Sequence, residues 1–245
     1  MKKEAKVLVL NLMPEKQKTQ DQYERVFSFL NLEFILIDEL FDKISQNEIG
    51  EYDAFIVSGT PLEKLAFEEV SYWQKITTVF DWARANIKST LFICWGSQAA
   101  LYYYYGVQKK VLNKKLFGVF PEKYESTELF SDLNSSLYIP HSRNAQSNYE
   151  EIKAIGNLNI LSYSSKTGAS IVEAKDKSQL FFNGHLEYDE TTLLEEYLRD
   201  INNDVKTDLP CNYFYSDNPD EAIIGQWLHY RDGIFKNWFK SYILE

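Results

Sequence analysis

The sequence has few of the residues that cross-link a fold or bind a metal. It contains two cysteines and three histidines in 245 residues. These are scattered without the spacing of metal ligands, so no metal site is expected. Two cysteines are too few for a disulfide framework, which favours a reducing, cytoplasmic setting. Ten glycines and six prolines exclude a collagen-like or low-complexity chain.

Long apolar runs are also absent. Runs such as Val7–Leu10 and Ala54–Val57 are far shorter than the roughly 18 residues of a membrane-spanning helix, so no membrane partner is expected. The basic start, Met1–Lys6, is not followed by an apolar segment of signal-peptide length. The net charge of −10 repels phosphate backbones, so no nucleic-acid partner is expected either.

The rest of the composition is that of an ordinary globular protein, with 44% hydrophobic and 25% charged residues. No repeat, linker or low-complexity segment divides the chain. A single domain over residues 1–245 is therefore expected.

Apolar runs and helical spacings alternate along the first hundred residues. The runs predict strands at 6–10, 33–38, 53–58 and 90–93, and the spacings predict helices at 19–30, 67–86 and 98–105. Thr19 is the expected N-cap of the first helix. Alternation of this kind indicates an α/β fold with a mostly parallel central sheet between two layers of helices.

The second half of the chain is less regular. Antiparallel pieces and substrate-facing loops are expected within 109–159. Strands return at 171–174 and 179–182, and a helix follows at 193–202. A last long helix over 223–244, interrupted near Gly233, completes the prediction.

Cys94 stands directly after a predicted buried strand and directly before a predicted helix. This is the position of a nucleophile elbow, where the helix N-terminus stabilises a thiolate. Gly96 permits the tight turn, and the amides that follow Cys94 point where an oxyanion would form.

His185 and Glu187 follow a second strand-like run. Ligands gather at the carboxyl ends of parallel strands, so His185 is expected to reach Cys94 and deprotonate it, with Glu187 orienting the imidazole. A lone cysteine or histidine is more often structural, but two such residues that each follow a strand favour catalysis. Cys211 and His229 lack this context, and no catalytic role is expected for them.

Cys-x-Gly-x-Gln followed by His-x-Glu resembles class I glutamine amidotransferases. The chain is more similar to a family of related fold, the homoserine O-acyltransferases (homoserine transsuccinylases). Segments matching in order include Asn11–Pro14, Gly59–Glu63, Cys94–Gln98, Pro140–Arg143 and Gly184–Asp189. The resemblance extends from Val9 to Phe214 and implies a flavodoxin-like, class I glutamine amidotransferase-like three-layer fold.

The resemblance implies a ping-pong acyl transfer with acyl-CoA as co-substrate and no permanently bound cofactor. Cys94 would carry the acyl group as a thioester, His185 would act as the base and Glu187 would hold it. The backbone N–H of Trp95, with an amide from the Gly59–Pro61 region, would form the oxyanion hole. The matched positions Lys115, Ser142 and Arg199 would bind the amino-acid substrate.

Glu63 occupies the position that separates acyl donors in this family. Glycine there goes with succinyl-CoA and a carboxylate with acetyl-CoA. A carboxylate fills space and repels the distal carboxylate of a succinyl group, by ~4 kcal/mol at about 4 Å and an effective dielectric near 20. Acetyl transfer is therefore predicted.

The resemblance also has departures. The N-terminal extension usual in the family is absent, the connection between Asp38 and Asp53 is short, and His185-Leu186-Glu187 replaces His-Pro-Glu. The acceptor is predicted to be L-homoserine, in methionine biosynthesis. The alternative is L-serine, in cysteine biosynthesis, because one methylene is worth only about 1–3 kcal/mol. A glutamine amidotransferase-like hydrolase and a non-enzymatic interaction protein are the less favoured readings.

The acidic chain must still attract CoA, which is an anion. Lys16, Lys18 and Lys64 are expected in loops at the carboxyl-end face of the sheet, where they would offset the overall charge. Family members are commonly dimers, so the resemblance is compatible with a homodimer.

Overall fold

The structure is a computed structural model that describes residues 5–244. Within that range, nine strands form one mixed sheet in the order β2-β1-β3-β4-β9-β8-β7-β5-β6. The first five in this order are parallel: β2 (Asn31–Ile35), β1 (Lys6–Leu10), β3 (Ala54–Val57), β4 (Ser89–Ile93) and β9 (Gln179–Phe182). The four central strands of this half are almost wholly buried, because helices cover both of their faces.

The other half of the sheet is antiparallel. It contains β8 (Gly168–Ala174), β7 (Leu158–Ser164), β5 (Lys109–Tyr124) and β6 (Leu137–Ser147). The long strands β5 and β6 form a hairpin, and their register shifts between Val111 and Leu116. β5 and β6 lie within 109–159, where the sequence predicted antiparallel pieces, and the strand predicted at 171–174 is the end of β8.

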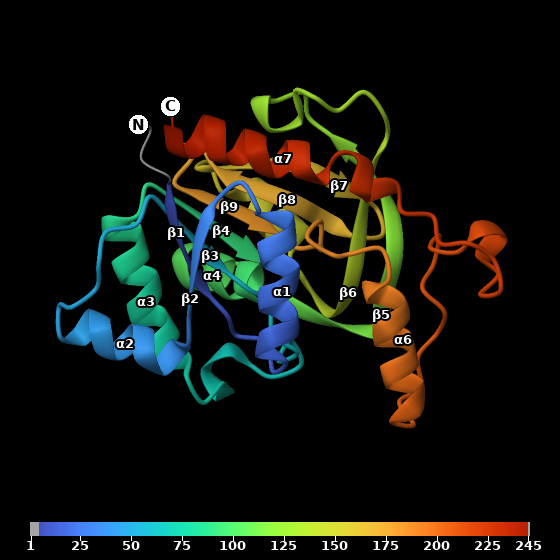
Figure 1. Cartoon of the computed structure of the whole chain (residues 1–245), viewed down its shortest axis with the longest axis horizontal. Coiled ribbons are helices and arrows are strands. Elements are labelled where there is room, and N and C mark those ends of the chain that lie inside the picture. The colour runs from blue at the N-terminus through green and yellow to red at the C-terminus, as the bar shows by residue number, and fades with distance from the viewer. Residues whose placement is uncertain (1–4, 245) are drawn as a thin grey trace.

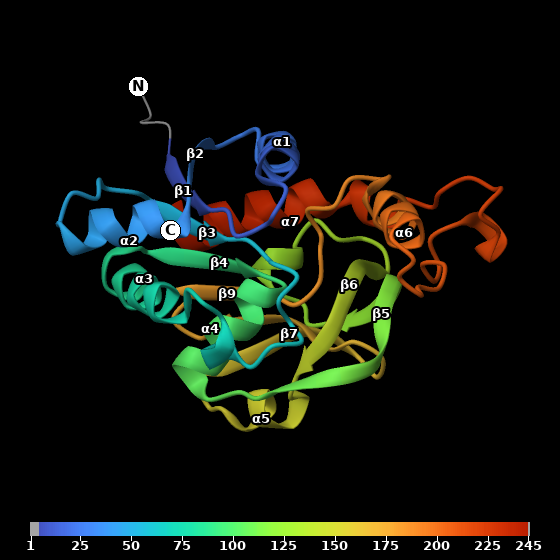
Figure 2. The same ribbon diagram turned by 90° about the horizontal axis from the view of Figure 1, so that it is seen from below.

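Helices form a layer on each face of the sheet (Figures 1 and 2). On one face, α1 (Lys16–Val26) and α7 (Arg231–Trp238) pack on the alternate strand residues that include Val7, Ile56 and Leu91. The other face is covered by α2 (Ile37–Ser45), α3 (Trp73–Asn86), α4 (Trp95–Tyr105) and α5 (Tyr149–Ala154). The predicted three-layer α/β fold is confirmed.

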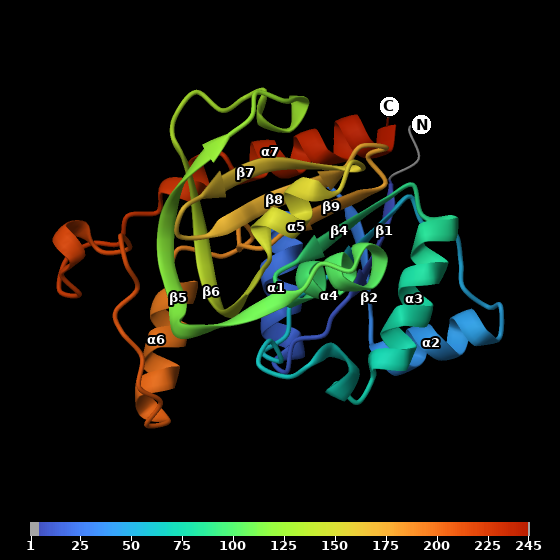
Figure 3. The same cartoon turned by 180° about the vertical axis from the view of Figure 1, so that it is seen from behind.

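One helix, α6 (Thr192–Asn202), projects from the body beside the β5–β6 hairpin (Figures 1 and 3). Short 3-10 turns lie at Phe67–Glu69, Glu128–Phe130, Tyr215–Asp217 and Gln226–His229, and a π-helical turn at Phe239–Leu244 follows α7. In the part of the chain that the structure describes, no helix combines the length and the apolar character needed to cross a membrane.

Two predicted boundaries near the N-terminus are wrong. The strand predicted at 33–38 ends at Ile35, and α2 begins at Ile37. The apolar residues of α2 already have helical spacing, at Ile37, Leu40, Phe41 and Ile44. Thr19 is not an N-cap: it lies inside α1, and its hydroxyl donates to the carbonyl of Glu15.

Two predicted helices are also interrupted differently. The segment 67–86 contains a 3-10 turn and then α3, because Val70 leaves the helical conformation with φ −71° and ψ 123°. The last segment contains a 3-10 turn at Gln226–His229, and α7 begins only at Arg231. Gly233 therefore lies within α7, and the expected interruption there is wrong.

Candidate active site

Cys94 is placed at a sharp turn between β4 and α4. Its φ of 51° and ψ of −113° lie outside the regions that a non-glycine residue normally adopts. Its N–H donates to the carbonyl of Phe182 on β9, at 2.7 Å. A Cβ on Gly96 would lie 2.8 Å from the carbonyl oxygen of Ser58, so only glycine lets α4 start this close to β3. The elbow that the sequence predicted is present.

His185 and Glu187 follow β9, the neighbour of β4 in the sheet. The N–H of His185 donates to the carbonyl of Pro140 at 2.8 Å, which ties this loop to β6. Nδ1 of His185 lies 2.6 Å from Oε1 of Glu187, and both side chains are buried. The imidazole also stacks on the ring of Tyr188, with 4.1 Å between the centroids.

The charge state of His185 is set by its two neighbours. Burial by itself would lower the pKa of this imidazole. The charges of Cys94 and Glu187, together with hydrogen bonds to both, outweigh burial and raise the pKa of His185 well above its usual value. The three predicted residues are thus brought together, and the raised pKa favours the protonated form of the His185 imidazole.

Asn183, directly before the histidine loop, connects that loop to the helix of the nucleophile. Its Oδ1 accepts from the hydroxyl of Ser97 on α4 at 2.9 Å, and its Nδ2 donates to the carbonyl of Ala169 on β8 at 2.8 Å. All of these groups are buried. The relative position of the elbow and the imidazole is therefore fixed by side chains as well as by the sheet.

The three residues expected to bind the amino acid gather beside the histidine. The ammonium of Lys115 on β5 lies 3.0 Å from Asp200, and the guanidinium of Arg199 lies 2.8 Å from the same carboxylate. Ser142 on β6 donates to Glu196 of α6. The sequence analysis predicted that these three residues form one substrate-binding site, but it did not identify Glu196.

Glu196 joins this cluster to the histidine. One of its oxygens accepts from the hydroxyl of Tyr188 at 2.6 Å, and the other lies 3.6 Å from the ammonium of Lys115. Tyr188 is the residue that stacks on His185. The signal available in the sequence was spacing, since Glu196 lies about one helical turn before Arg199.

Glu63 lies in the loop after β3. Its Oε1 accepts from the backbone N–H of Asn144 at 3.1 Å and from the side-chain amide of Asn144 at 2.8 Å. The residue is buried, and its carboxylate is held against β6. The same loop begins at Gly59, where a Cβ would lie 3.8 Å from the amide nitrogen of Trp95. The two segments expected to supply the oxyanion hole are therefore adjacent.

Of the lysines expected in loops to attract CoA, Lys16 and Lys18 instead lie in the first turn of α1, and only Lys64 lies in a loop. Lys18 pairs with Glu195 at 2.5 Å, and the ammonium of Lys16 donates to the carbonyl of Asn11 at 2.9 Å. Lys64 is exposed and forms no ion pair with any described residue. The other cysteine, Cys211, is exposed, and its backbone pairs with β5. His229 is also exposed.

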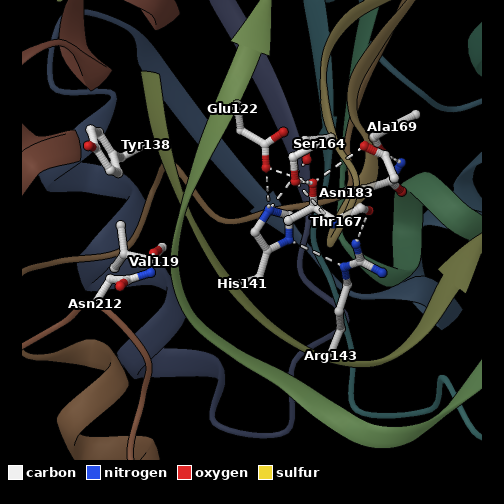
Figure 4. A network of polar contacts seen from close by, with 12 residues as sticks. Val119, Glu122, Tyr138, His141, Arg143, Ser164, Thr167, Ala169, Asn183 and Asn212 are labelled. Atoms are coloured by element: carbon white, nitrogen blue, oxygen red, sulfur yellow. Dashed lines mark hydrogen bonds and ion pairs between the residues drawn. The ribbon is translucent and has the colours of Figure 1, made fainter. Parts of the chain in front are cut away.

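A buried polar network surrounds His141, next to Asn183 (Figure 4). The Nε of Arg143 donates to Nδ1 of His141 at 3.3 Å, and Nε2 of His141 lies 3.6 Å from Glu122. The hydroxyl of Thr167 donates to Glu122 at 2.7 Å. Burial raises the pKa of Glu122 to about 7 and lowers that of His141 well below its usual value. The sequence analysis did not anticipate this network.

Residues 5–244 contain no group of three or more His, Cys, Asp or Glu side chains arranged to hold a metal ion.

Solved structures with a similar fold belong to glutamine amidotransferases. One from Thermotoga maritima superposes with a TM-score of 0.65 at 12% identity, covering 99% of this chain and 100% of its own. One from Methylobacillus flagellatus gives 0.64 at 9% identity, covering 98% and 95%. At these identities the likeness shows the fold alone. The fold is that of the class I glutamine amidotransferase-like proteins.

Sequence comparison identifies the family. A family model described as homoserine O-succinyltransferase matches residues 33–245. A protein of Brevibacillus brevis is 36% identical over 98% of this chain and 85% of its own length, and one of Bacillus subtilis is 37% identical over 98% and 86%. Both relatives carry the name homoserine O-acetyltransferase. The chain belongs to the homoserine O-succinyltransferase family of acyltransferases.

Proposed function

We propose that this chain is an O-acetyltransferase that moves acetyl from acetyl-CoA, through a thioester on Cys94, to the hydroxyl of L-homoserine. The observation that carries the proposal is the contact of His185 with Glu187 and Cys94, at the carboxyl ends of β4 and β9, in a chain of this family. The named relatives favour homoserine over serine as the acceptor.

In the first half-reaction, the thiolate of Cys94 attacks the carbonyl carbon of acetyl-CoA. The backbone N–H of Trp95 and an amide of the Gly59–Pro61 region stabilise the oxyanion. The C–S bond to CoA then breaks, and the imidazolium of His185 gives its proton to the departing thiolate. Acetyl-Cys94 and a neutral His185 remain.

In the second half-reaction, neutral His185 removes the proton from the acceptor hydroxyl. The alkoxide attacks the thioester carbonyl, the bond to Cys94 breaks, and the thiolate and imidazolium are restored. Glu187 holds the imidazole through Nδ1, so that Nε2 is the nitrogen that exchanges the proton.

The amino-acid acceptor carries an ammonium and a carboxylate, and the cluster beside His185 offers partners for both. Arg199 suits the carboxylate because its guanidinium can donate two parallel hydrogen bonds. The carboxylate of Glu196 suits the substrate ammonium. Ser142 and Lys115 hold this Glu196 carboxylate in place. Asp200 competes with the substrate for Arg199, so its ion pair with Arg199 must open when the acceptor binds.

The acetyl preference rests on Glu63. Its carboxylate is buried and fixed by two hydrogen bonds from Asn144, so it cannot swing away from an incoming acyl group. A neutral acetyl group tolerates this charge, whereas the distal carboxylate of a succinyl group is repelled by it.

The remaining features of the proposal concern the setting. The enzyme is proposed to act in the cytoplasm in methionine biosynthesis, as one catalytic domain and as a homodimer. Lys16, Lys18 and Lys64 are proposed to attract CoA. A Lys64→Ala variant with an unchanged KM for acetyl-CoA would remove that residue from the proposal, and light scattering of the purified protein tests the dimer.

The decisive experiment measures CoA release by purified protein with acetyl-CoA and either L-homoserine or L-serine, with succinyl-CoA as the alternative donor. We expect the highest kcat/KM for acetyl-CoA with homoserine, and no turnover by Cys94→Ser. A preference for serine would overturn the acceptor, and faster use of succinyl-CoA would overturn the donor. Ammonia release from glutamine without acyl-CoA would instead favour the hydrolase reading.

A further inference from the structure

Lys109 places an unpaired cation close to the elbow. Its ammonium lies 3.9 Å from the centroid of the Phe67 ring, and that ring lies 6.0 Å from the ring of Trp95, the residue after Cys94. The nitrogen is buried, and no described residue offers it a hydrogen bond. A buried ammonium without a partner is costly, so such a group calls for a ligand or a compensating charge.

Glu63 supplies the compensating charge without contacting the cation. It precedes Phe67 by four residues, and its carboxylate is bound by Asn144 on β6, the strand that pairs with the strand of Lys109. No ion pair within 4.0 Å joins Lys109 to any described carboxylate. Glu68 is exposed and accepts from the hydroxyl of Tyr102, so solvent weakens its effect on the ammonium.

We propose that Lys109 is the cation of the acyl-donor site and that Glu63 masks it, so that the two side chains together select acetyl over acyl groups that end in a carboxylate. This inference rests on the proposed acyl transfer. With Glu63 present, the charge of Lys109 is balanced and a second carboxylate is rejected. Without Glu63, the free ammonium above the apolar face of Phe67 suits a short aliphatic chain that ends in a carboxylate, such as a succinyl group.

The charge of Lys109 is available at neutral pH. Burial lowers the pKa of its ammonium to about 8, and the charges of Glu63 and Glu68 oppose that decrease. The protonated form therefore predominates at pH 7 and is lost as the pH rises past 8. Removing Glu63 lowers this pKa further, so any activity that depends on the cation must decline on the alkaline side.

The test measures acylation of Cys94 by intact-protein mass, with acetyl-CoA or succinyl-CoA and no acceptor. Glu63→Gly is compared with three double variants that add Lys109→Met, Lys109→Arg or Lys110→Met. Lys110 is the exposed neighbour of Lys109 and serves as the matched control. The ratio of the succinylation rate to the acetylation rate is recorded for each, so that a misfolded variant loses both rates without changing the ratio.

We expect Glu63→Gly to raise this ratio at least tenfold, the effect of about one hydrogen bond to a charged group. Adding Lys109→Met should return the ratio to the wild-type value, whereas adding Lys109→Arg or Lys110→Met should keep the gain. The gain should also decline as the pH rises, beginning below pH 8, because the loss of Glu63 lowers the pKa of Lys109 further.

Two results would overturn the inference: a gain that survives Lys109→Met, or no gain in Glu63→Gly. If Lys109→Met impairs folding, Lys109→Gln removes the same charge with a polar side chain. Acylation of Cys94 without transfer to homoserine would refute the proposed acceptor. The ratio of the succinylation rate to the acetylation rate would still test the role of Lys109. A wild-type protein that accepts neither acyl group would refute both.

Discussion

Replacing Gly184 by alanine should separate the geometry of the site from its chemistry. A Cβ there would lie 2.4 Å from Cγ2 of Ile139, 2.8 Å from Cε1 of His141 and 2.9 Å from the carbonyl oxygen of Pro140. Carbon atoms normally approach to about 3.5–4.0 Å, so the loop must shift by about 1 Å. The Pro140 carbonyl cannot move freely, because it accepts from the N–H of His185 at 2.8 Å.

The magnitude follows from this shift. Overpacking of a buried position costs about 1–3 kcal/mol of unfolding free energy. His185 is the next residue, and a misplacement of about 1 Å in a catalytic group lowers the rate by about 100-fold. We therefore expect Gly184→Ala to remain folded at 25 °C, with kcat reduced much more than its lost stability would explain.

The assay combines urea unfolding with steady-state kinetics on the same preparation. Gly156→Ala is the matched control, because a Cβ at Gly156 would meet no atom within 4 Å. It should keep its kcat and change the unfolding free energy by less than about 0.5 kcal/mol. If Gly184→Ala retains wild-type kcat and stability, then the close approach of β6 does not position His185 and the reasoning is refuted.

Three other changes test the remaining parts of the site. Glu187→Gln should lower kcat by about 10³-fold and move the alkaline limb of the kcat/KM pH profile to lower pH, since the charge of Glu187 raises the pKa of His185; an unmoved limb would contradict this. The pKa of Glu122 is raised to about 7, so its ionisation destabilises the folded state. As the pH rises from 5 to 8, Glu122→Gln should therefore become more stable than the wild type by up to about 3 kcal/mol in urea unfolding. A stability difference that stays constant with pH would count against this prediction. Glu196→Gln should raise the KM for homoserine at least tenfold while acetylation of Cys94 continues, and Glu195→Gln on the same helix is the control.

The sequence was sufficient for the parallel half of the fold because burial on both faces leaves a direct signal. The run Phe55–Val57 is apolar without alternation, as a strand between two helix layers must be. The same signal drew attention to Cys94, which directly follows such a run, and to His185, which lies three residues after one. The local sequence was sufficient to predict these features, because a buried strand and the residues that follow it are adjacent in the chain.

The antiparallel half could not be predicted in the same detail. β5 carries exposed and buried residues in no simple alternation, and its register with β6 shifts after Val111, so its pairing depends on tertiary contacts. Glu122 and His141 are polar in sequence yet wholly or almost wholly buried, because they are packed against each other. Glu196 forms its contacts with Ser142 and Tyr188 only in the folded chain, because these residues come from separate segments.

The proposed triad and the proposed acceptor site lie on different parts of the sheet. The proposed nucleophile and base follow β4 and β9, whose parallel pairing places them at one edge of the sheet. Arg199 and Glu196, which are proposed to bind the acceptor, come from α6, and Lys115 and Ser142, which hold Glu196, come from β5 and β6, outside that parallel set. A thioester is open to any nucleophile that reaches it, so transfer to an amino acid requires the acceptor hydroxyl to be held beside His185 in place of water. In the proposed reaction the antiparallel hairpin and α6 supply the charges for that task, and the hydrogen bond from His185 to Pro140 joins β6 of that hairpin to the proposed base.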